Sequence, residues 1–178
     1  RKKLSDSHIS EILALYRGNP LYFKHCPPSP DEDTVKGDLR ALPDGKSAED
    51  KHFLGFYDKN LLVAVMDLIT CYPDSNPAFI GLFMVAETRQ GIGTGSQIIS
   101  ECLRALKSMG FGRVRLAAVD TNEQAKRFWE KNGFSPTGEK YPTETYALFV
   151  WKSNYGNPPV HKNAARLFET GGQHFLFQ

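Results

Sequence analysis

The chain has 178 residues, of which 40% are hydrophobic and 24% charged, and its formal net charge is +2. This length is enough for one soluble domain with a substantial core, and the small, dispersed positive charge argues against nucleic acid as a partner. The longest apolar runs, 61–66 and 78–86, are far shorter than the roughly 20 residues that span a bilayer, so we expect no membrane segment and a cytoplasmic protein. Three cysteines without a Cys-x-x-Cys pair or a His cluster predict reduced thiols and no metal site.

Helical spacing dominates the first part of the chain. Apolar residues follow the capping sequence 5–7 at helical intervals, and Gly, Asn and Pro at 18–20 end the pattern. A second helix is expected from about Ser29 to Leu42, because Ser caps a helix, Pro suits its first turn and acids favour its positive end. The next apolar runs, 53–57 and 61–69, flank a polar turn and predict an antiparallel hairpin.

The second part of the chain alternates strand and helix. We expect strands over 79–85, 114–119 and 146–151, and the segment 136–143 as a loop. Strand, helix and strand in succession require a parallel crossover, whereas the hairpin is antiparallel. The fold class is therefore α/β (α+β), with a mixed central sheet flanked by helices. The helices of this part begin after the glycine-rich turn and at Asn122, and they end at Gly110 and Gly133.

The end of the chain has a different texture. A linker-like stretch over 155–159 precedes a weakly patterned segment, with a short helix expected over 164–169 and a short strand over 174–177. We therefore expect one domain over 1–152 and a C-terminal extension over 153–178. Three arrangements of the extension stay open: packed on its own domain, exchanged in a homodimer, or mobile.

The most informative feature is the glycine-rich turn over 90–95, between a strand and an amphipathic helix. Glycines let a ligand approach the backbone, and the amides of a helix start attract an anion such as a phosphate. A P-loop is excluded, because no Gly-Lys-Ser or Gly-Lys-Thr follows the turn. A dinucleotide fingerprint fits poorly, because Ser96 stands at the third glycine position and Asp120 follows Gly91 by 29 residues, where roughly 20 is expected.

Two motifs in residues 81–134 resemble the GNAT superfamily of N-acetyltransferases, which bind acetyl-CoA. Gln90, Gly93 and Gly95 match its pattern of Arg or Gln, two residues, Gly, one residue, then Gly or Ala. Residues 122–134 resemble the later passage of Asn, two residues, Ala, an aromatic pair and a closing Gly-Phe. The resemblance implies a GNAT-like fold with a V-shaped opening between the strands 79–85 and 114–119.

The resemblance also implies which residues hold acetyl-CoA. Backbone groups near the end of the first of these strands would bind the pantetheine arm, and the glycine-rich turn would receive the pyrophosphate. The later helix would contribute a pantetheine contact and a lysine for the adenosine-side phosphate, with Lys126 as a further candidate. The residues implied are Phe83, Met84, Val85, Gln90, Gly91, Ile92, Gly93, Thr94, Gly95, Ser96, Asn122, Ala125, Phe128, Trp129 and Lys131.

The candidates for the catalytic acid and base differ from those of many relatives. Many relatives have a Tyr where this chain has Trp129, and an indole N–H is not a usable acid. Two acids are candidate bases for an acceptor amine: Asp67, inside an apolar strand, and Asp120, at a strand end. Tyr141, Tyr146 and Cys71 are distant substitutes that we expect to be structural.

The expected function is N-acetyl transfer from acetyl-CoA to a small-molecule or peptide amine, with residues 19–25 shaping the choice of acceptor. Two alternatives remain. One is a non-catalytic sensor or scaffold that binds acyl-CoA, which the absence of the Tyr favours. The other is a nicotinamide-dependent enzyme, against which the spacing of the dinucleotide motif argues.

Overall fold

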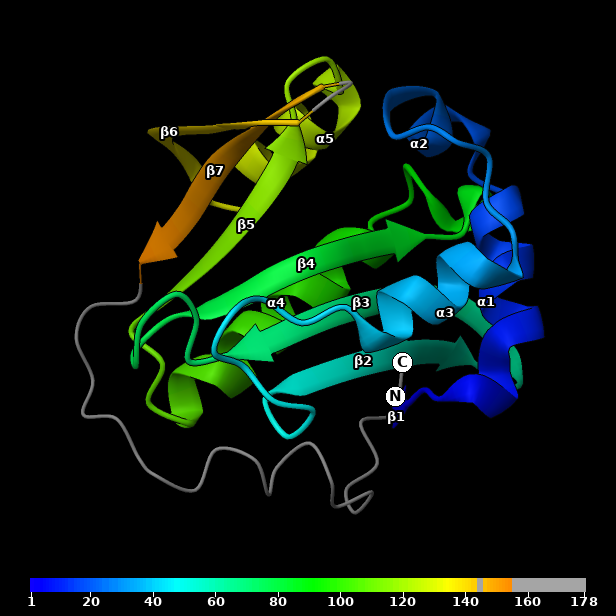
Figure 1. The fold of residues 1–178 in the computed structure, drawn as a ribbon, viewed down its shortest axis with the longest axis horizontal. Coiled ribbons are helices and arrows are strands. Elements are labelled where there is room, and N and C mark those ends of the chain that lie inside the picture. The colour runs from blue at the N-terminus through cyan, green and yellow to red at the C-terminus, as the bar shows by residue number, and fades with distance from the viewer. Residues whose placement is uncertain (144–145, 155–178) are drawn as a thin grey trace.

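The protein, seen here as a computed structural model, is described over residues 1–143 and 146–154, and its strands form one mixed sheet (Figure 1). The helix expected over 164–169 and the strand expected over 174–177 lie outside the described residues. Among the described strands, β4 and β5 are parallel and the other neighbours are antiparallel. The strand order is β1-β2-β3-β4-β5-β7-β6, with bounds β1 Lys2–Lys3, β2 Lys51–Asp58, β3 Leu61–Thr70, β4 Ala78–Val85, β5 Arg113–Val119, β6 Ser135–Pro142 and β7 Ala147–Asn154.

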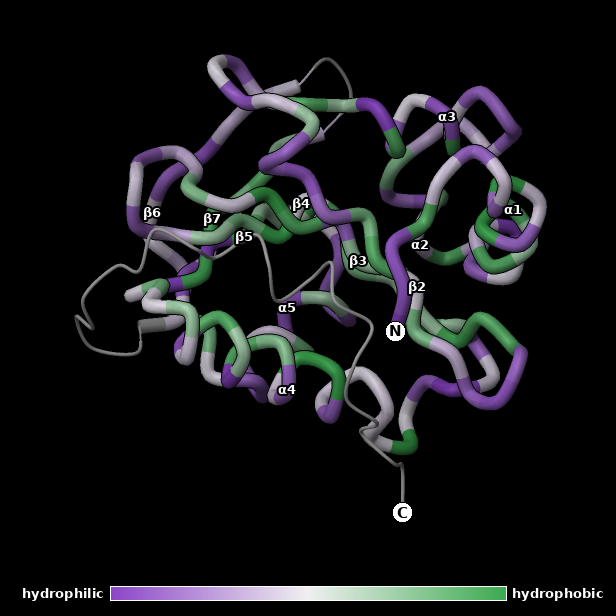
Figure 2. The backbone as a smooth tube through the Cα atoms, turned by 90° about the horizontal axis from the view of Figure 1, so that it is seen from below, coloured by the Kyte–Doolittle hydropathy of each residue, from purple (hydrophilic) through white to green (hydrophobic). Residues whose placement is uncertain are grey.

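Helices cover both faces of the sheet (Figure 2), and a hydrophobic core lies on each face. The cores are separate because alternate side chains of a strand point to opposite faces. Thus Met66 of β3 packs in the core with α4 and α5, whereas Val65 packs in the core with α1 and α3. The helices are α1 Ile9–Arg17, α2 Pro20–His25, α3 Glu32–Arg40, α4 Thr94–Ser108 and α5 Glu123–Lys131.

The predicted mixed sheet and its flanking helices are confirmed, but parts of the periphery differ. The segment 136–143, expected as a loop, mostly belongs to strand β6, which pairs with β7. Pro136 and an irregular register before Lys140 hide this strand in the sequence, and an exposed edge strand tolerates both. The short helix α2 was also not predicted, because six residues without a buried side chain show no helical period.

Strand β4 carries a bulge that the sequence pattern did not predict. Asp67 of β3 lies opposite Leu82, whereas the next residue of β3 lies opposite Ile80, so Gly81 is an extra residue on β4. A bulge changes which side chains face each core. Ile80 packs toward α4 before the bulge, and Phe83 does so after it.

The two parallel strands separate soon after they meet. Their pairing joins 78–80 of β4 to 114–116 of β5 and then stops. Beyond this point the strands diverge like the arms of a V, as Figure 1 shows between β4 and β5. The backbone of β4 from Gly81 onward therefore faces an opening on this side, as the resemblance implied. Within 1–143 and 146–154, no helix combines the length and the apolar character that crossing a membrane requires.

Candidate functional site

The glycine-rich turn leads directly into helix α4. Gly91 has a φ of +74° and Gly93, the residue before the first helical turn, has a φ of +94°. These left-handed conformations favour glycine, because a Cβ atom there is strained. A Cβ atom at either position meets no atom within 4 Å, so the glycines serve the path of the backbone and leave the space beside it open.

The backbone amides of this turn are free to bind a ligand. The first bond of the helix runs from the amide of Gln97 to the carbonyl of Gly93. Within the described part of the chain, no acceptor takes a hydrogen bond from the amides of residues 91–96. Free amides at the positive end of a 15-residue helix form a cradle for an anion. A diphosphate fits this donor set.

A cavity of about 450 Å³ adjoins the turn, and we call it the glycine-turn cavity. It extends from the turn along β4 and α5. Of the residues implied to hold acetyl-CoA, only Ile92, which is 69% exposed, and Thr94 do not line it. The remaining members of that set all line the cavity: Phe83, Met84, Val85, Gln90, Gly91, Gly93, Gly95, Ser96, Asn122, Ala125, Phe128, Trp129 and Lys131.

Side-chain hydrogen bonds join the two sides of the opening. Gln90 donates through Nε2 to Asn19 Oδ1 at 2.7 Å, and its Oε1 accepts from Gln124 Nε2 at 3.0 Å. Near the end of α2, His25 Nδ1 lies 2.9 Å from Thr121 Oγ1, in the loop that follows β5. Gln90 therefore holds the surrounding elements together, and the backbone amides after it are left for the ligand.

Helix α5 presents a polar start and an apolar middle. The Oδ1 atom of Asn122 caps the helix by accepting from the amide of Ala125 at 3.0 Å, which leaves its Nδ2 group to donate elsewhere. Phe128 explains the glycine at the last position of the motif, because a Cβ atom on Gly95 would lie 3.0 Å from its ring. Trp129 is buried and packs edge-on against Phe128, with its place in the cavity wall.

The two lysines of α5 differ. Lys131 lines the glycine-turn cavity and remains a candidate for a phosphate contact. Lys126 pairs with Asp120 at 3.2 Å and with Glu123 at 2.9 Å, and it does not line the cavity. The ion pair with Lys126 gives Asp120 a structural role, and Asp120 lines neither this cavity nor the two cavities that follow. We therefore retain Asp67 and set aside Asp120 as a candidate base.

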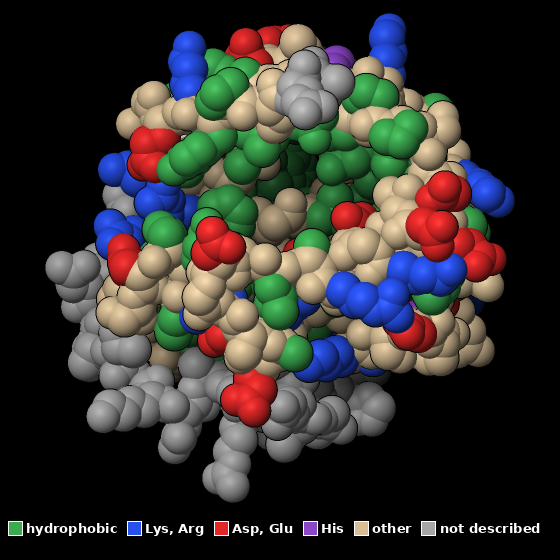
Figure 3. Space-filling view, viewed as in Figure 1, with side chains coloured by type: hydrophobic (Ala, Val, Ile, Leu, Met, Phe, Trp, Pro, Cys, Tyr) green, Lys and Arg blue, Asp and Glu red, His purple; other side chains and the backbone are tan. Residues whose placement is uncertain are grey.

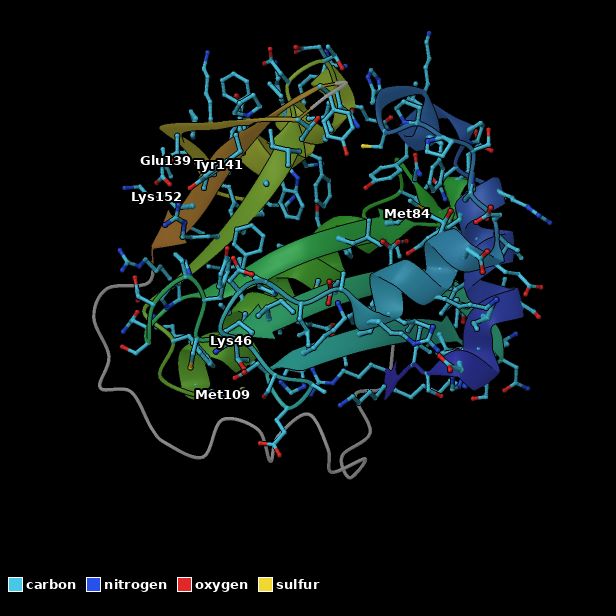
Figure 4. The ribbon with its side chains drawn as sticks, viewed as in Figure 1. Lys46, Met84, Met109, Glu139, Tyr141 and Lys152 are labelled. Carbon is cyan, nitrogen blue, oxygen red and sulfur yellow. The ribbon has the colours of Figure 1, made fainter. Side chains whose placement is uncertain are left out.

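A second cavity of about 420 Å³ lies between the arms of the V, and we call it the aromatic cavity. It shares part of its wall with the glycine-turn cavity, so the two cavities adjoin each other. In Figure 3 it lies in the hollow bordered by hydrophobic side chains at the centre of the view. Tyr141 on β6 and Met84 on β4 belong to opposite arms (Figure 4). The aromatic side chains that line the cavity are Tyr22, Tyr72, Phe79, Phe83, Trp129, Tyr141 and Tyr146.

Asp67 lies beside the bulge, in a third cavity of about 410 Å³ that shares Tyr22 and Gly81 with the aromatic cavity. Its Oδ2 atom is 2.7 Å from Lys51 Nζ, and its buried Oδ1 atom has no hydrogen-bond partner among the described residues. Burial raises the pKa of Asp67, and the ammonium of Lys51 partly opposes this shift. Asp38 lines the same cavity, and burial raises its pKa as well.

Gly81 lines both the aromatic cavity and the third cavity, which contains Asp67. A Cβ atom on Gly81 would lie 3.0 Å from Asp67 Oδ2. The absence of a side chain here leaves the carboxylate close to the point where β4 leaves β5. The sequence signal for this feature was a glycine inside an apolar strand, which often marks a bulge.

Several residues of the site were not predicted as ligand contacts. Tyr141 and Tyr146, expected to be structural, line the aromatic cavity, whereas Cys71 does not. Tyr22 lies on α2 and lines all three cavities. Its segment, 19–25, was the region expected to shape the choice of acceptor.

The comparisons with known proteins agree with this geometry. A family model described as "Acetyltransferase (GNAT) family" matches residues 13–134. No curated protein matches the sequence.

Solved structures show similarity of fold. An acetyltransferase from Thermus thermophilus superposes with a TM-score of 0.71 at 19% identity, covering 86% of this chain and 95% of its own. The PaiA N-acetyltransferase from Thermoplasma acidophilum, in complex with coenzyme A, superposes with a TM-score of 0.63 at 16% identity. The match covers 86% of this chain and 97% of the PaiA chain. The ribosomal-protein-S18-alanine N-acetyltransferase from Escherichia coli superposes with a TM-score of 0.63 at 13% identity. The match covers 91% of this chain and 96% of the Escherichia coli chain.

Proposed function

Because the chain belongs to the acetyltransferase (GNAT) family, we propose that it transfers the acetyl group of acetyl-CoA to a primary amine by direct attack of that amine. The observation that carries the proposal is the row of free amides over 91–96 beside the glycine-turn cavity. The structure of PaiA N-acetyltransferase in complex with coenzyme A supports the same choice of cosubstrate.

The described residues divide the binding of acetyl-CoA among themselves. The amides of the glycine-rich turn would hold the pyrophosphate, and Lys131 would contact the adenosine-side phosphate. Asn122 would donate its free Nδ2 group to an amide of the pantetheine arm, while Ala125 leaves room beside it. The unpaired backbone of β4 near Phe83 would bind the rest of the arm and polarise the acetyl carbonyl.

Asp67 is the proposed general base. When bound, acetyl-CoA supplies a thioester, whose acetyl group moves to the amine nitrogen while the thiol of CoA departs. A primary amine with a pKa of about 10.4 arrives protonated, so it must lose a proton before it attacks. A carboxylate with a raised pKa beside the open Gly81 position suits this role. Orientation in the cavity and polarisation by the backbone would supply most of the rate.

Trp129→Phe is expected to leave turnover within about tenfold of the wild-type value. The indole is not an acid, and a thiol with a pKa of about 8.5 leaves readily as the thiolate. Steady-state kinetics with acetyl-CoA and an accepted amine measure this. A loss on the order of a thousandfold, about 4 kcal/mol of barrier, would mean that Trp129 takes part in the chemical step.

The test of the proposed function combines binding with product detection. Calorimetry measures the affinity for acetyl-CoA, and mass spectrometry detects acetylated products from a panel of polyamines, amino acids, antibiotics, arylalkylamines and peptide N-termini. Binding together with an acetylated product supports the proposal. Tight binding without any product would favour the acyl-CoA sensor, and a lack of binding would contradict both functions.

A further inference from the structure

The aromatic cavity carries information about the acceptor. Its walls come from distant parts of the chain: Tyr22 on α2, Tyr72 before β4, Phe79 on β4, and Tyr141 and Tyr146 at the far arm. Tyr72 and Phe79 pack edge to face, with their ring centroids 5.5 Å apart. Such walls offer ring faces and edges, with which a flat aromatic group packs favourably. A cavity of about 420 Å³ suits a small molecule.

The charges around this cavity are few and uneven. Arg115 is the charged side chain in its described wall, and its Nη2 atom donates to Glu139 Oε2 at 2.6 Å, which balances the charge. At the adjoining end, Asp67 and Asp38 line the third cavity, where Lys51 is the neighbouring cation. The ammonium of Lys51 donates hydrogen bonds to Asp67 Oδ2 and to the carbonyl of Ala41.

This end of the site therefore has one more carboxylate than ammonium. Asp38 accepts a hydrogen bond from the hydroxyl of Tyr16 at 2.7 Å, which orients its carboxylate but adds no positive charge. A single positive charge on a ligand would balance the site. Several positive charges would have no further carboxylate partner in the described walls of the aromatic cavity and the third cavity.

We infer that the acceptor is a small monoamine, in which a short alkyl chain joins an aromatic ring to one primary ammonium group. The inference rests on the proposed function and adds the class of acceptor. The ring lies among the tyrosines of the aromatic cavity. The ammonium points through the open Gly81 position toward Asp67, where the amine is close to its base and to the splayed backbone of β4. Ring faces around the cavity also attract the ammonium as it passes.

The experiment compares 2-phenylethylamine with hexylamine, spermidine and an alanine-starting peptide. Mass spectrometry of the acetylated products gives kcat/KM. Calorimetry on the CoA-bound protein measures amine affinity without any transfer, with uncharged 2-phenylethanol as a ligand control. We expect 2-phenylethylamine to exceed hexylamine by about tenfold and spermidine by about a hundredfold in kcat/KM. We expect 2-phenylethanol to bind about tenfold more weakly than the amine.

Tyr141→Ser tests the aromatic wall. Tyr141 is 54% exposed at the rim, so its replacement leaves the cores intact. We expect about tenfold weaker binding of 2-phenylethylamine, with the affinity for hexylamine changed less than about twofold. Leu61→Ser is the matched control, because Leu61 is 60% exposed and lines none of the three cavities. This control should bind both amines as the wild-type protein does.

The outcomes separate the inference from the proposed function. If acetyl-CoA binds and spermidine or the peptide is the better acceptor, the inference is overturned and the proposed function stands. Equal affinities for the two monoamines, or an unchanged affinity in Tyr141→Ser, would also overturn it. If acetyl-CoA does not bind, the proposed function itself fails.

Discussion

Gly93→Asp is expected to weaken the binding of coenzyme A at least about 100-fold, which corresponds to about 2.7 kcal/mol. Two effects combine. Gly93 has a φ of +94°, where a side chain strains the backbone by roughly 1–2 kcal/mol. The new carboxylate also lies among the amides that would hold a diphosphate, so like charges repel. Calorimetry with coenzyme A measures the loss.

Two variants separate strain from charge. Gly93→Ala keeps the strain without the charge, and we expect it to lose about tenfold in affinity. Gly138→Asp places the same residue at another left-handed position, with a φ of +87° and no atom within 4 Å of the added Cβ. Gly138 lines none of the three cavities, so this variant should bind coenzyme A normally. An unchanged affinity in Gly93→Asp would contradict the assignment of the phosphate cradle.

Asp67→Asn is expected to lower kcat/KM for the acceptor amine about 100-fold or more, the usual contribution of a general base. The amide is similar in size to the carboxylate but cannot take up the proton. Lys51 keeps its hydrogen bond to the carbonyl of Ala41. The affinity for coenzyme A should stay unchanged, because Asp67 does not line the glycine-turn cavity. Steady-state kinetics and calorimetry together check both parts.

The pH profile distinguishes a base from a merely structural acid. Burial raises the pKa of Asp67, the ammonium of Lys51 lowers it, and Asp38 raises it. The base works when ionised, so activity rises with pH through the pKa of Asp67. Lys51→Met removes the lowering effect, so this acidic limb should move to higher pH. In Asp67→Asn the limb should disappear.

Lys51→Met is the matched control for stability as well. It breaks the same ion pair as Asp67→Asn but keeps the carboxylate. Breaking a buried pair from one side costs about 3–5 kcal/mol, so circular dichroism should record a lower Tm. If Asp67→Asn keeps both the acidic limb and most of the activity, the base lies elsewhere.

Local patterns in the sequence predicted the part of the site that one short segment builds. The glycine-rich turn and the start of α5 each owe their form to neighbouring residues, through backbone conformation, capping and helical period. The set of fifteen residues implied for acetyl-CoA came from the resemblance to the GNAT superfamily, and thirteen of them line the glycine-turn cavity. The two exceptions, Ile92 and Thr94, alternate with the glycines and do not line the cavity.

The rest of the site depends on contacts between distant segments, which local patterns do not contain. The wall of the aromatic cavity includes Tyr22, Tyr72 and Tyr141, which come from separate segments of the chain. The strand β6 was missed because an edge strand needs no alternating apolar pattern.

The bulge in β4 also determines which residues in the second half of that strand face each side of the sheet. Phe83 and Val85 belong to the core with α4, whereas Leu82 and Met84 belong to the core with α1 and α3. Removing Gly81 would restore a regular ladder in which Leu82 and Phe83 keep their present faces, because they stay opposite Asp67 and Met66 of β3. The extra residue therefore serves the site and not the cores: its deletion would remove the open position beside Asp67 and leave the side chains of both cores on their present faces.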